Sequence, residues 1–164
     1  MMNPSLILRL ALAASIFSLA AAYTAQYGFG LQPCHLCLAQ RVPFALVIVL
    51  SLAGLWKLRW RLGLICVIGA AFLVNSGIAG YHAAVEKQWV AGPSGCTQGE
   101  APPNQSTDDL LKRIMDAPIV ACDQPAWEFH GITMAGMNKA WCLFLAAATF
   151  VALQQSRKKG GAHA

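Results

Sequence analysis

Apolar residues gather into four long stretches along this chain, separated by polar segments of very different length. Charged side chains are missing from residues 10–27, 42–56, 62–81 and 140–155. A membrane-crossing α-helix needs about 20 predominantly apolar residues, so the second and fourth stretches depend on their flanks. With flanks included, the predicted spans run over about 8–27, 40–57, 62–81 and 134–155. The pattern predicts an all-α membrane protein in which residues 1–164 form one four-helix transmembrane bundle.

Composition agrees with a membrane protein. Hydrophobic residues make up 57% of the chain and charged residues only 12%, whereas soluble domains carry about 25% charged residues. The first stretch could alternatively be a cleavable signal peptide, because Arg9 precedes an apolar run that ends in small residues at 18–22. That run is longer than the usual core of such a signal, and three further stretches follow it, so we favour a retained span.

The distribution of charge predicts the orientation of the bundle. Basic residues mark the two chain ends and the turn at 57–61, namely Arg9, Lys57, Arg59, Arg61, Arg157, Lys158 and Lys159. All 7 acidic residues lie between the third and fourth stretches. By the positive-inside rule both termini are cytoplasmic, and the loops at about 28–39 and 82–133 face outward. We therefore interpret the net charge of +5 as a topology signal, with membrane lipid as a partner and no nucleic acid.

The long outward loop contains a polar part and a short helical pattern. Residues 91–105 are rich in Gly, Pro, Ser, Thr, Asn and Gln, which predicts a mobile segment that exposes Cys96. Ser106 and Asp109 then fit a capping box. The apolar positions at 110–115 lie on one face, which predicts a small amphipathic helix at the membrane surface or against the bundle.

Cysteines carry the candidate chemistry. Cys34 and Cys37 form a C-x-x-C pair between the first two spans, and Cys96 and Cys122 lie in the long loop. Thiols on an oxidising outer face are usually bridged. Four such cysteines allow three pairings. A 34–37 bridge with a 96–122 bridge is the simplest, but the sequence leaves the choice open. Cys66 and Cys142, inside the third and fourth spans, are expected to be buried packing residues.

Three roles compete for the four outward cysteines. Static bridges are common outside the cytoplasm, but a C-x-x-C bridge closes too short a loop to stabilise much. A metal site would need further ligands such as His35 or His130, and thiols in an oxidising compartment tend to be bridged before metal arrives. We assign no metal. Thiol–disulfide exchange is favoured, because C-x-x-C pairs commonly have a lowered thiol pKa.

Arg41 follows Cys37 by four positions, so on a helix the two share a face. Its cation could stabilise a thiolate or bind a carbonyl group of a ligand, or it could simply reach the lipid headgroups. Tyr81 and His82, at the outer end of the third span, could border such a ligand site. We favour an interfacial aromatic belt for these two residues.

The chain resembles the DsbB family of bacterial disulfide-generating membrane proteins. The resemblance rests on Pro-Cys-His-Leu-Cys at 33–37 with Arg41, on the second cysteine pair in a long loop, and on Trp-Glu-Phe at 127–129. It implies a quinone-dependent thiol oxidase of the bacterial inner membrane that reoxidises a periplasmic DsbA-like thioredoxin-fold protein.

By the same resemblance, Cys96 would form the mixed disulfide with the partner, and Cys122 would resolve within the outward loop. Cys34 would exchange with Cys122, Cys37 would face ubiquinone or menaquinone, and Arg41 would help to bind that cofactor. The alternatives are a membrane assembly or interaction protein with structural disulfides and a vitamin K epoxide reductase-like enzyme. The second is disfavoured, because that family usually carries its C-x-x-C on the last span.

Overall fold

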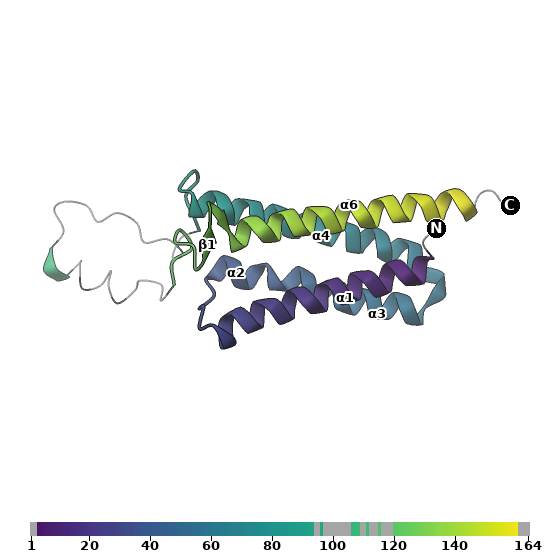
Figure 1. Cartoon of the computed structure of the whole chain (residues 1–164), viewed down its shortest axis with the longest axis horizontal. Coiled ribbons are helices and arrows are strands. Elements are labelled where there is room, and N and C mark those ends of the chain that lie inside the picture. The colour runs from purple at the N-terminus through teal and green to yellow at the C-terminus, as the bar shows by residue number, and fades with distance from the viewer. Residues whose placement is uncertain are drawn as a thin grey trace.

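Four long helices form a bundle in the computed structural model, which describes residues 3–93, 96, 106–108, 111, 115 and 120–160. Both termini lie at one end of the bundle, and the connection that carries a small β-hairpin lies at the other (Figure 1). The helices and strands are α1 (Pro4–Tyr23), η1 (Thr24–Gly28), α2 (His35–Ala39), α3 (Arg41–Trp56), η2 (Leu58–Trp60), α4 (Arg61–Glu86), β1 (Glu128–Phe129), β2 (Ile132–Thr133) and α6 (Met134–Gly160).

The predicted fold class is confirmed. Four helical segments are long and apolar enough to cross a membrane, at Pro4–Gly28, His35–Trp56, Arg61–Glu86 and Met134–Ser156. The predicted third span stopped at residue 81, whereas α4 continues to Glu86. This extension adds His82 and Glu86 to the helix, one turn apart on the same face. The short helix expected at 110–115 and its capping box lie largely outside the described residues.

Local sequence sets the helix starts at both ends of the bundle. Asn3 caps α1 by accepting a hydrogen bond from the Ser5 amide, and Pro4 occupies the first turn, where no amide hydrogen is needed. Cys34 caps α2 in the same way with its sulfur atom. Between β1 and β2, His130 and Gly131 both have positive φ angles of 51° and 78°. This is the backbone conformation of a tight two-residue hairpin turn.

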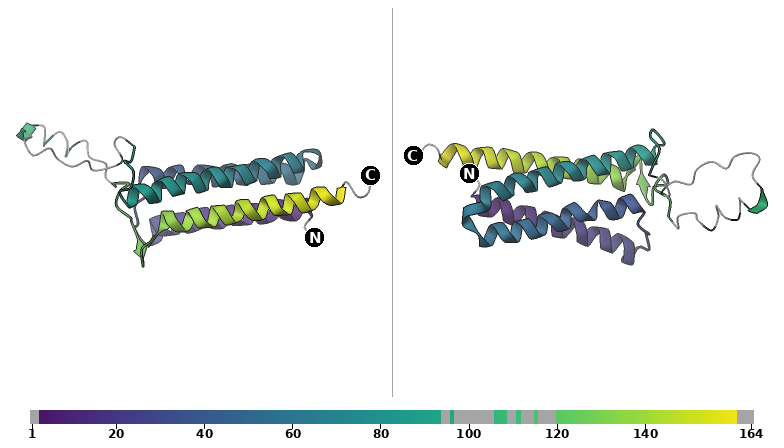
Figure 2. Two further views of the ribbon diagram at one scale, coloured as in Figure 1. Left: turned by 90° about the horizontal axis from the view of Figure 1, so that it is seen from above. Right: turned by 180° about the vertical axis from the view of Figure 1, so that it is seen from behind.

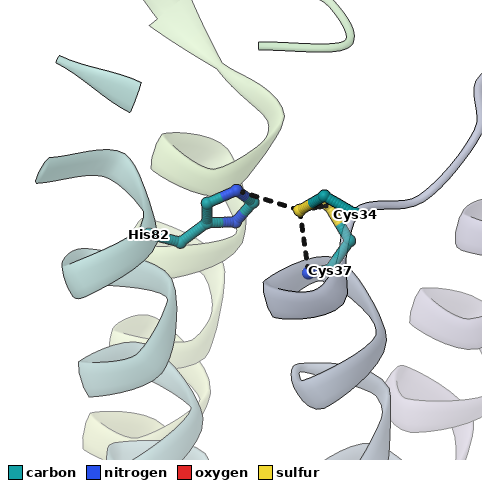
Figure 3. A group of neighbouring side chains, drawn as sticks. All are labelled: Cys34, Cys37 and His82. Carbon is teal, nitrogen blue, oxygen red and sulfur yellow. Dashed lines mark hydrogen bonds between the residues drawn. The ribbon is translucent and has the colours of Figure 1, made fainter. Parts of the chain in front are cut away.

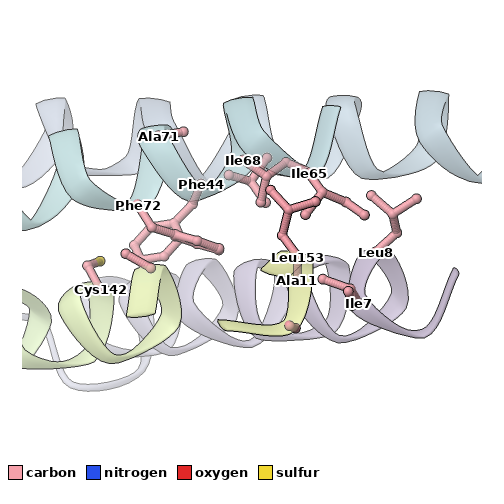
Figure 4. Close-up of a cluster of buried hydrophobic side chains, with 13 residues drawn as sticks. Ile7, Leu8, Ala11, Phe44, Ile65, Ile68, Ala71, Phe72, Cys142 and Leu153 are labelled. Carbon is pink, nitrogen blue, oxygen red and sulfur yellow. The ribbon is translucent and has the colours of Figure 1, made fainter. Parts of the chain in front are cut away.

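Packing joins the helices in two pairs that lie side by side: α4 runs along α6, and α1 runs along α3, which also contacts α4 (Figure 2). The core between them consists of aliphatic side chains and the edge-to-face pair of Phe44 and Phe72 (Figure 4). Close approach of α4 and α6 depends on Gly69, where an added Cβ would lie 2.9 Å from the Phe150 ring.

Polar links also tie the helices together. The Ser76 hydroxyl donates to the Lys139 carbonyl across α4 and α6 at 3.0 Å, and the Trp141 indole donates to the Ser18 hydroxyl across α6 and α1 at 3.0 Å. Cys142 is buried as expected, but the expectation for Cys66 is wrong: its side chain is exposed on the surface of α4. In a membrane that surface faces lipid, where an apolar thiol costs little.

Replacing Gly69 by alanine should destabilise the bundle, because the new methyl group would press on the Phe150 ring at 2.9 Å. Overpacking of this kind costs about 1–3 kcal/mol of unfolding free energy. Gly77→Ala is the matched control in the same helix, since nothing lies within 4 Å of its added Cβ. It should be as stable as the parent or more so, because alanine favours helix. Thermal denaturation in detergent compares the two, and equal midpoints would contradict the packing argument.

Candidate functional site

The C-x-x-C pair sits at the start of α2, at the end of the bundle away from the termini. Cys34 is the cap residue of this helix, and its Sγ accepts a hydrogen bond from the Cys37 amide at 3.4 Å. The two sulfur atoms lie 3.3 Å apart as an unbridged, hydrogen-bonded pair. A helix N-terminus favours negative charge, so this position stabilises a thiolate at Cys34.

His82 on α4 completes the immediate surroundings of Cys34. Its Nε2 lies 3.4 Å from the Cys34 Sγ and 3.6 Å from Oε1 of Glu86, one turn further along the helix. Figure 3 shows the ring of His82 directed across the helix interface at the cysteine pair. Only 2% of His82 is exposed, so this contact is shielded from solvent.

Hydrogen bonding makes Cys34 acidic. The bond from the Cys37 thiol lowers the pKa of Cys34 to about 4, against the opposing effect of burial, and the contact with His82 adds to the lowering. A pKa far below neutral means that Cys34 is a thiolate at physiological pH. Since the thiolate is the nucleophile in disulfide exchange, Cys34 is the reactive member of the pair.

The second cysteine pair is bridged. Cys96 and Cys122 form a disulfide, and both pack in one buried cluster with Cys34, Leu36 and Val85, to which Cys37 is adjacent. The structure therefore brings together all four cysteines that the sequence singled out. The simplest predicted pairing had two bridges. The structure contains the one between Cys96 and Cys122, whereas Cys34 and Cys37 are free thiols.

The expected exposure of Cys96 is wrong. Only 3% of this residue is accessible, and Cys122 is fully buried. Through the bridge to Cys122, Cys96 belongs to the buried cluster that also contains Val85 and Cys34. The bridge is therefore shielded from solvent at both of its cysteines.

Arg41, the first residue of α3, contacts the end of α1 and the following η1. Its Nη1 donates to Oε1 of Gln26 at 2.8 Å, and its guanidinium carbon lies 4.8 Å from the centre of the Tyr23 ring. The side chain does not bond to either cysteine within the described part of the chain. It does line the same cavity as they do.

That cavity has a volume of about 340 Å³ and is lined by residues of α1, α2, α3, α4 and α6 and of the loop before α2. Both thiols, Arg41 and His82 line one part of its wall, and Phe17 and Met137 line another. Phe17 is 68% exposed and Met137 47% exposed on the bundle surface, so the cavity wall reaches the face that would meet lipid. A mostly apolar cavity with a few polar groups is typical of a site for a small organic ligand.

A metal ion is the other ligand to consider. Ligand atoms of Cys34, Cys37 and His82 lie within 4.8 Å of one another, as a grouping found among the described residues. The histidines that the sequence offered for a metal site, His35 and His130, do not belong to it. The hydrogen bond between Nδ1 of His82 and Nε2 of Gln40 opposes this use.

Sequence reasoning missed three residues of the site. His82 was assigned to an aromatic belt, yet it contacts Cys34, and Glu86 and Gln40 were not considered at all. A signal existed for each. Polar side chains within apolar membrane helices are costly and commonly mark function. His82 and Glu86 also lie four residues apart, and Gln40 follows Cys37 by three.

Four membrane-crossing helices with two cysteine pairs packed together at one end define a multi-pass membrane protein of thiol–disulfide exchange. The sequence profile of the family described as disulfide bond formation protein DsbB matches residues 4–152. The chain therefore belongs to the DsbB family. An uncharacterized protein of Rickettsia prowazekii (strain Madrid E) is 30% identical over 125 residues, which cover 76% of this chain and 73% of that protein. No solved structure matches the chain significantly.

Membership in this family has consequences for function at a coarse level. The protein is a membrane disulfide oxidoreductase, and a thiol–disulfide partner in the periplasm is implied. The predicted site residues are compatible with that activity, because they hold one oxidised and one reduced cysteine pair side by side.

Cys34 should react with iodoacetamide in acidic solution. A lowered pKa means that the thiolate persists above that pKa and is lost as the pH falls through it, so half-maximal reactivity of the folded protein should fall near pH 4. Mass spectrometry of the labelled peptide assigns the label to Cys34. The denatured protein is the matched control, with a midpoint of about 8.5 expected for an ordinary thiol. A midpoint of the folded protein near that of the control would contradict a stabilised thiolate.

Proposed function

We propose that this protein is a quinone-dependent thiol oxidase that reoxidises a periplasmic DsbA-like thioredoxin-fold protein. One observation carries the proposal: the free thiols of Cys34 and Cys37 line an apolar cavity on one side and pack against the Cys96–Cys122 bridge on the other. Such a pair can exchange electrons both with a second cysteine pair and with a lipid-soluble ligand.

The proposed orientation places the cysteine end in the periplasm of a bacterial inner membrane. Arg9 and the basic turn at 57–61 belong to the end of the bundle that holds the termini, opposite the cysteines (Figure 1). By the positive-inside rule that end is cytoplasmic. The periplasm is oxidising, which agrees with a bridged Cys96–Cys122 pair.

The residues suit the following sequence of exchanges. A thiolate of the partner attacks Cys96, forming an intermolecular disulfide and releasing Cys122 as a thiolate. The partner's second thiolate then attacks the partner's sulfur atom of this mixed disulfide and releases Cys96. The partner leaves with a disulfide, and Cys96 and Cys122 are both reduced. Cys122 next attacks Cys34 of an oxidised Cys34–Cys37 pair, and Cys96 closes the bridge with Cys122. The electrons now rest on Cys34 and Cys37, which is the state described here.

If bound in this cavity, ubiquinone or menaquinone would take up two electrons from the Cys34 thiolate and the Cys37 thiol, together with the Cys37 proton and one proton from water. The products would be the Cys34–Cys37 disulfide and the quinol. The cavity residues fit such a ligand, because an apolar wall suits the ring and tail. Arg41 offers a charged donor for a ring carbonyl group. Oxidising a partner as oxidising as DsbA (about −120 mV) needs an acceptor of still higher potential, and a margin of about 30 mV corresponds to roughly 1.4 kcal/mol for two electrons.

A second candidate is a membrane assembly protein whose disulfide is purely structural. The full burial of Cys122 favours this alternative, because exchange requires access to the bridge. Under it, reducing the bridge would lower stability without any electron flow to quinone. The next experiment separates the two functions.

Replacing Cys37 by serine should reduce quinone-dependent oxidation of a DsbA-like partner to background, because no second thiol remains to close the 34–37 bridge. The mixed disulfide between the partner and Cys96 should still be trapped on gels. Cys66→Ser is the matched control, since Cys66 is exposed away from the cavity lining, and it should keep full activity. Normal quinone reduction by the Cys37→Ser protein would refute the proposed function.

Replacing Arg41 by methionine removes the charged donor while keeping most of the side-chain volume. We expect KM for quinone to rise about tenfold, as for loss of one charge-assisted hydrogen bond, with a smaller change in kcat. Arg59→Met at the opposite end of the bundle is the control. Equal KM values for the two variants would remove Arg41 from the quinone site.

A further inference from the structure

Gln40 lies between α2 and α3 and is buried at the centre of a hydrogen-bond network. Its Nε2 lies 2.8 Å from Nδ1 of His82 and 3.2 Å from the carbonyl oxygen of Leu36. Its Oε1 accepts a hydrogen bond from Nδ2 of Asn138 at 2.6 Å. One amide side chain therefore connects the cysteine-bearing helix to both α4 and α6.

The Leu36 carbonyl decides which way this amide faces. A backbone carbonyl can only accept hydrogen bonds, so the group beside it must be the amide nitrogen of Gln40. That nitrogen has two hydrogens, and the second is directed at His82. Nδ1 of His82 must then be an acceptor without a proton, and in a neutral imidazole the proton consequently sits on Nε2. Nε2 is the atom that lies 3.4 Å from Cys34.

The network continues toward the middle of the bundle with the same direction of donation. Nδ2 of Asn75 donates to Sγ of Cys142 at 3.4 Å, and Cys142 donates to Oδ1 of Asn138 at 3.4 Å. Asn138 in turn donates to Gln40. Hydrogen bonds in such a chain polarise one another in surroundings of low dielectric constant. Each link therefore strengthens the donor that finally faces the Cys34 sulfur.

We propose that Gln40 is a positioning residue that holds His82 in the tautomer with its proton on Nε2, so that His82 donates a hydrogen bond to the Cys34 thiolate. Its role in turnover rests on the proposed function, because that thiolate belongs to the Cys34–Cys37 pair that is proposed to reduce quinone. His82 then stabilises the reduced centre as a donor and neither removes a proton from Cys34 nor binds a metal. Metal binding through Nε2 would need the opposite tautomer, with an acceptor opposite Nδ1.

Other ionisable groups around His82 and Cys34 do not reverse this assignment. Cys37 faces Cys34 from α2, Glu86 faces Nε2 from α4 at 3.6 Å, Glu128 on β1 acts on Glu86 from further away, and Arg41 on α3 bonds to Gln26. An ionised Glu86 also favours a proton on Nε2. A second proton on Nδ1 would place two N–H groups, one of His82 and one of Gln40, against each other without an acceptor between them.

The tautomer can be read by NMR of the full-length reduced protein in detergent, with ¹⁵N-labelled histidine and His82 assigned by loss of its signals in His82→Asn. At neutral pH we expect Nδ1 of His82 to carry no proton. Gln40→Glu replaces the N–H with a carboxylate oxygen, which should place a proton on Nδ1. Gln154→Glu, an exposed position on α6, is the matched control and should leave the wild-type pattern unchanged.

A second readout follows the Cys34 thiolate. In Gln40→Leu, the rate of Cys34 alkylation at pH 4 should fall about fivefold, which corresponds to a rise of about one unit in a pKa of about 4. Gln154→Leu should match the wild type. Asn138→Leu removes the donor to Oε1 of Gln40 and the acceptor for Cys142 but leaves Gln40 itself in place, so it should shift the rate in the same direction by less. This variant keeps the test usable if Gln40→Leu does not fold.

Three results would overturn the proposal: a proton on Nδ1 in the wild type, an unchanged tautomer in Gln40→Glu, or Zn²⁺ that protects Cys34 from alkylation while moving the His82 proton to Nδ1. A purely structural role for Gln40 would lower the thermal midpoint and leave tautomer and alkylation unchanged. Neither readout requires quinone or partner. If the wild-type protein shows the predicted tautomer but does not reduce quinone, that result would therefore count only against the proposed function.

Discussion

The structure depends on one constraint: polar groups placed between apolar helices have to find their hydrogen-bond partners in one another. In hydrocarbon there is no water to satisfy them, and each unpaired group costs several kcal/mol. The contacts of Gln40 with His82 and with Asn138 meet this requirement at the junction of α3, α4 and α6. The same contacts determine how the cysteine-bearing helix is positioned against its neighbours. Packing of the bundle and geometry of the site are thus results of one set of bonds.

Negative charge on a sulfur atom is the second feature that this arrangement makes possible. Burial by itself disfavours a thiolate, and the lowered pKa of Cys34 shows that hydrogen bonds from Cys37 and His82 outweigh that cost. The bridged pair of Cys96 and Cys122 lies in the same buried cluster as this sulfur, so the four cysteines meet where the thiolate is shielded from water. The arrangement restricts access, and a partner has to open it.

Much of the architecture could be predicted from the sequence. Four apolar stretches, the basic turn and the C-x-x-C pair with Arg41 were sufficient for the fold class and the family, because hydrophobic length and motif spacing are local properties. Contacts across helices were not accessible in this way. His82 was predicted to lie in an aromatic belt, and Cys96 was expected to be exposed. Each prediction failed because a partner distant in sequence, Cys34 or Cys122, decides the environment of the residue.

The sequence by itself determined that this chain is a four-span membrane protein with cysteines at one end, since the cost of placing charge in hydrocarbon leaves few alternatives. Only the tertiary structure decided which cysteines are bridged, which sulfur is a thiolate and which nitrogen of His82 faces it. Those properties depend on distances of 3 to 4 Å between side chains from different helices. Such distances follow from how α2, α4 and α6 pack together, and no single segment specifies them.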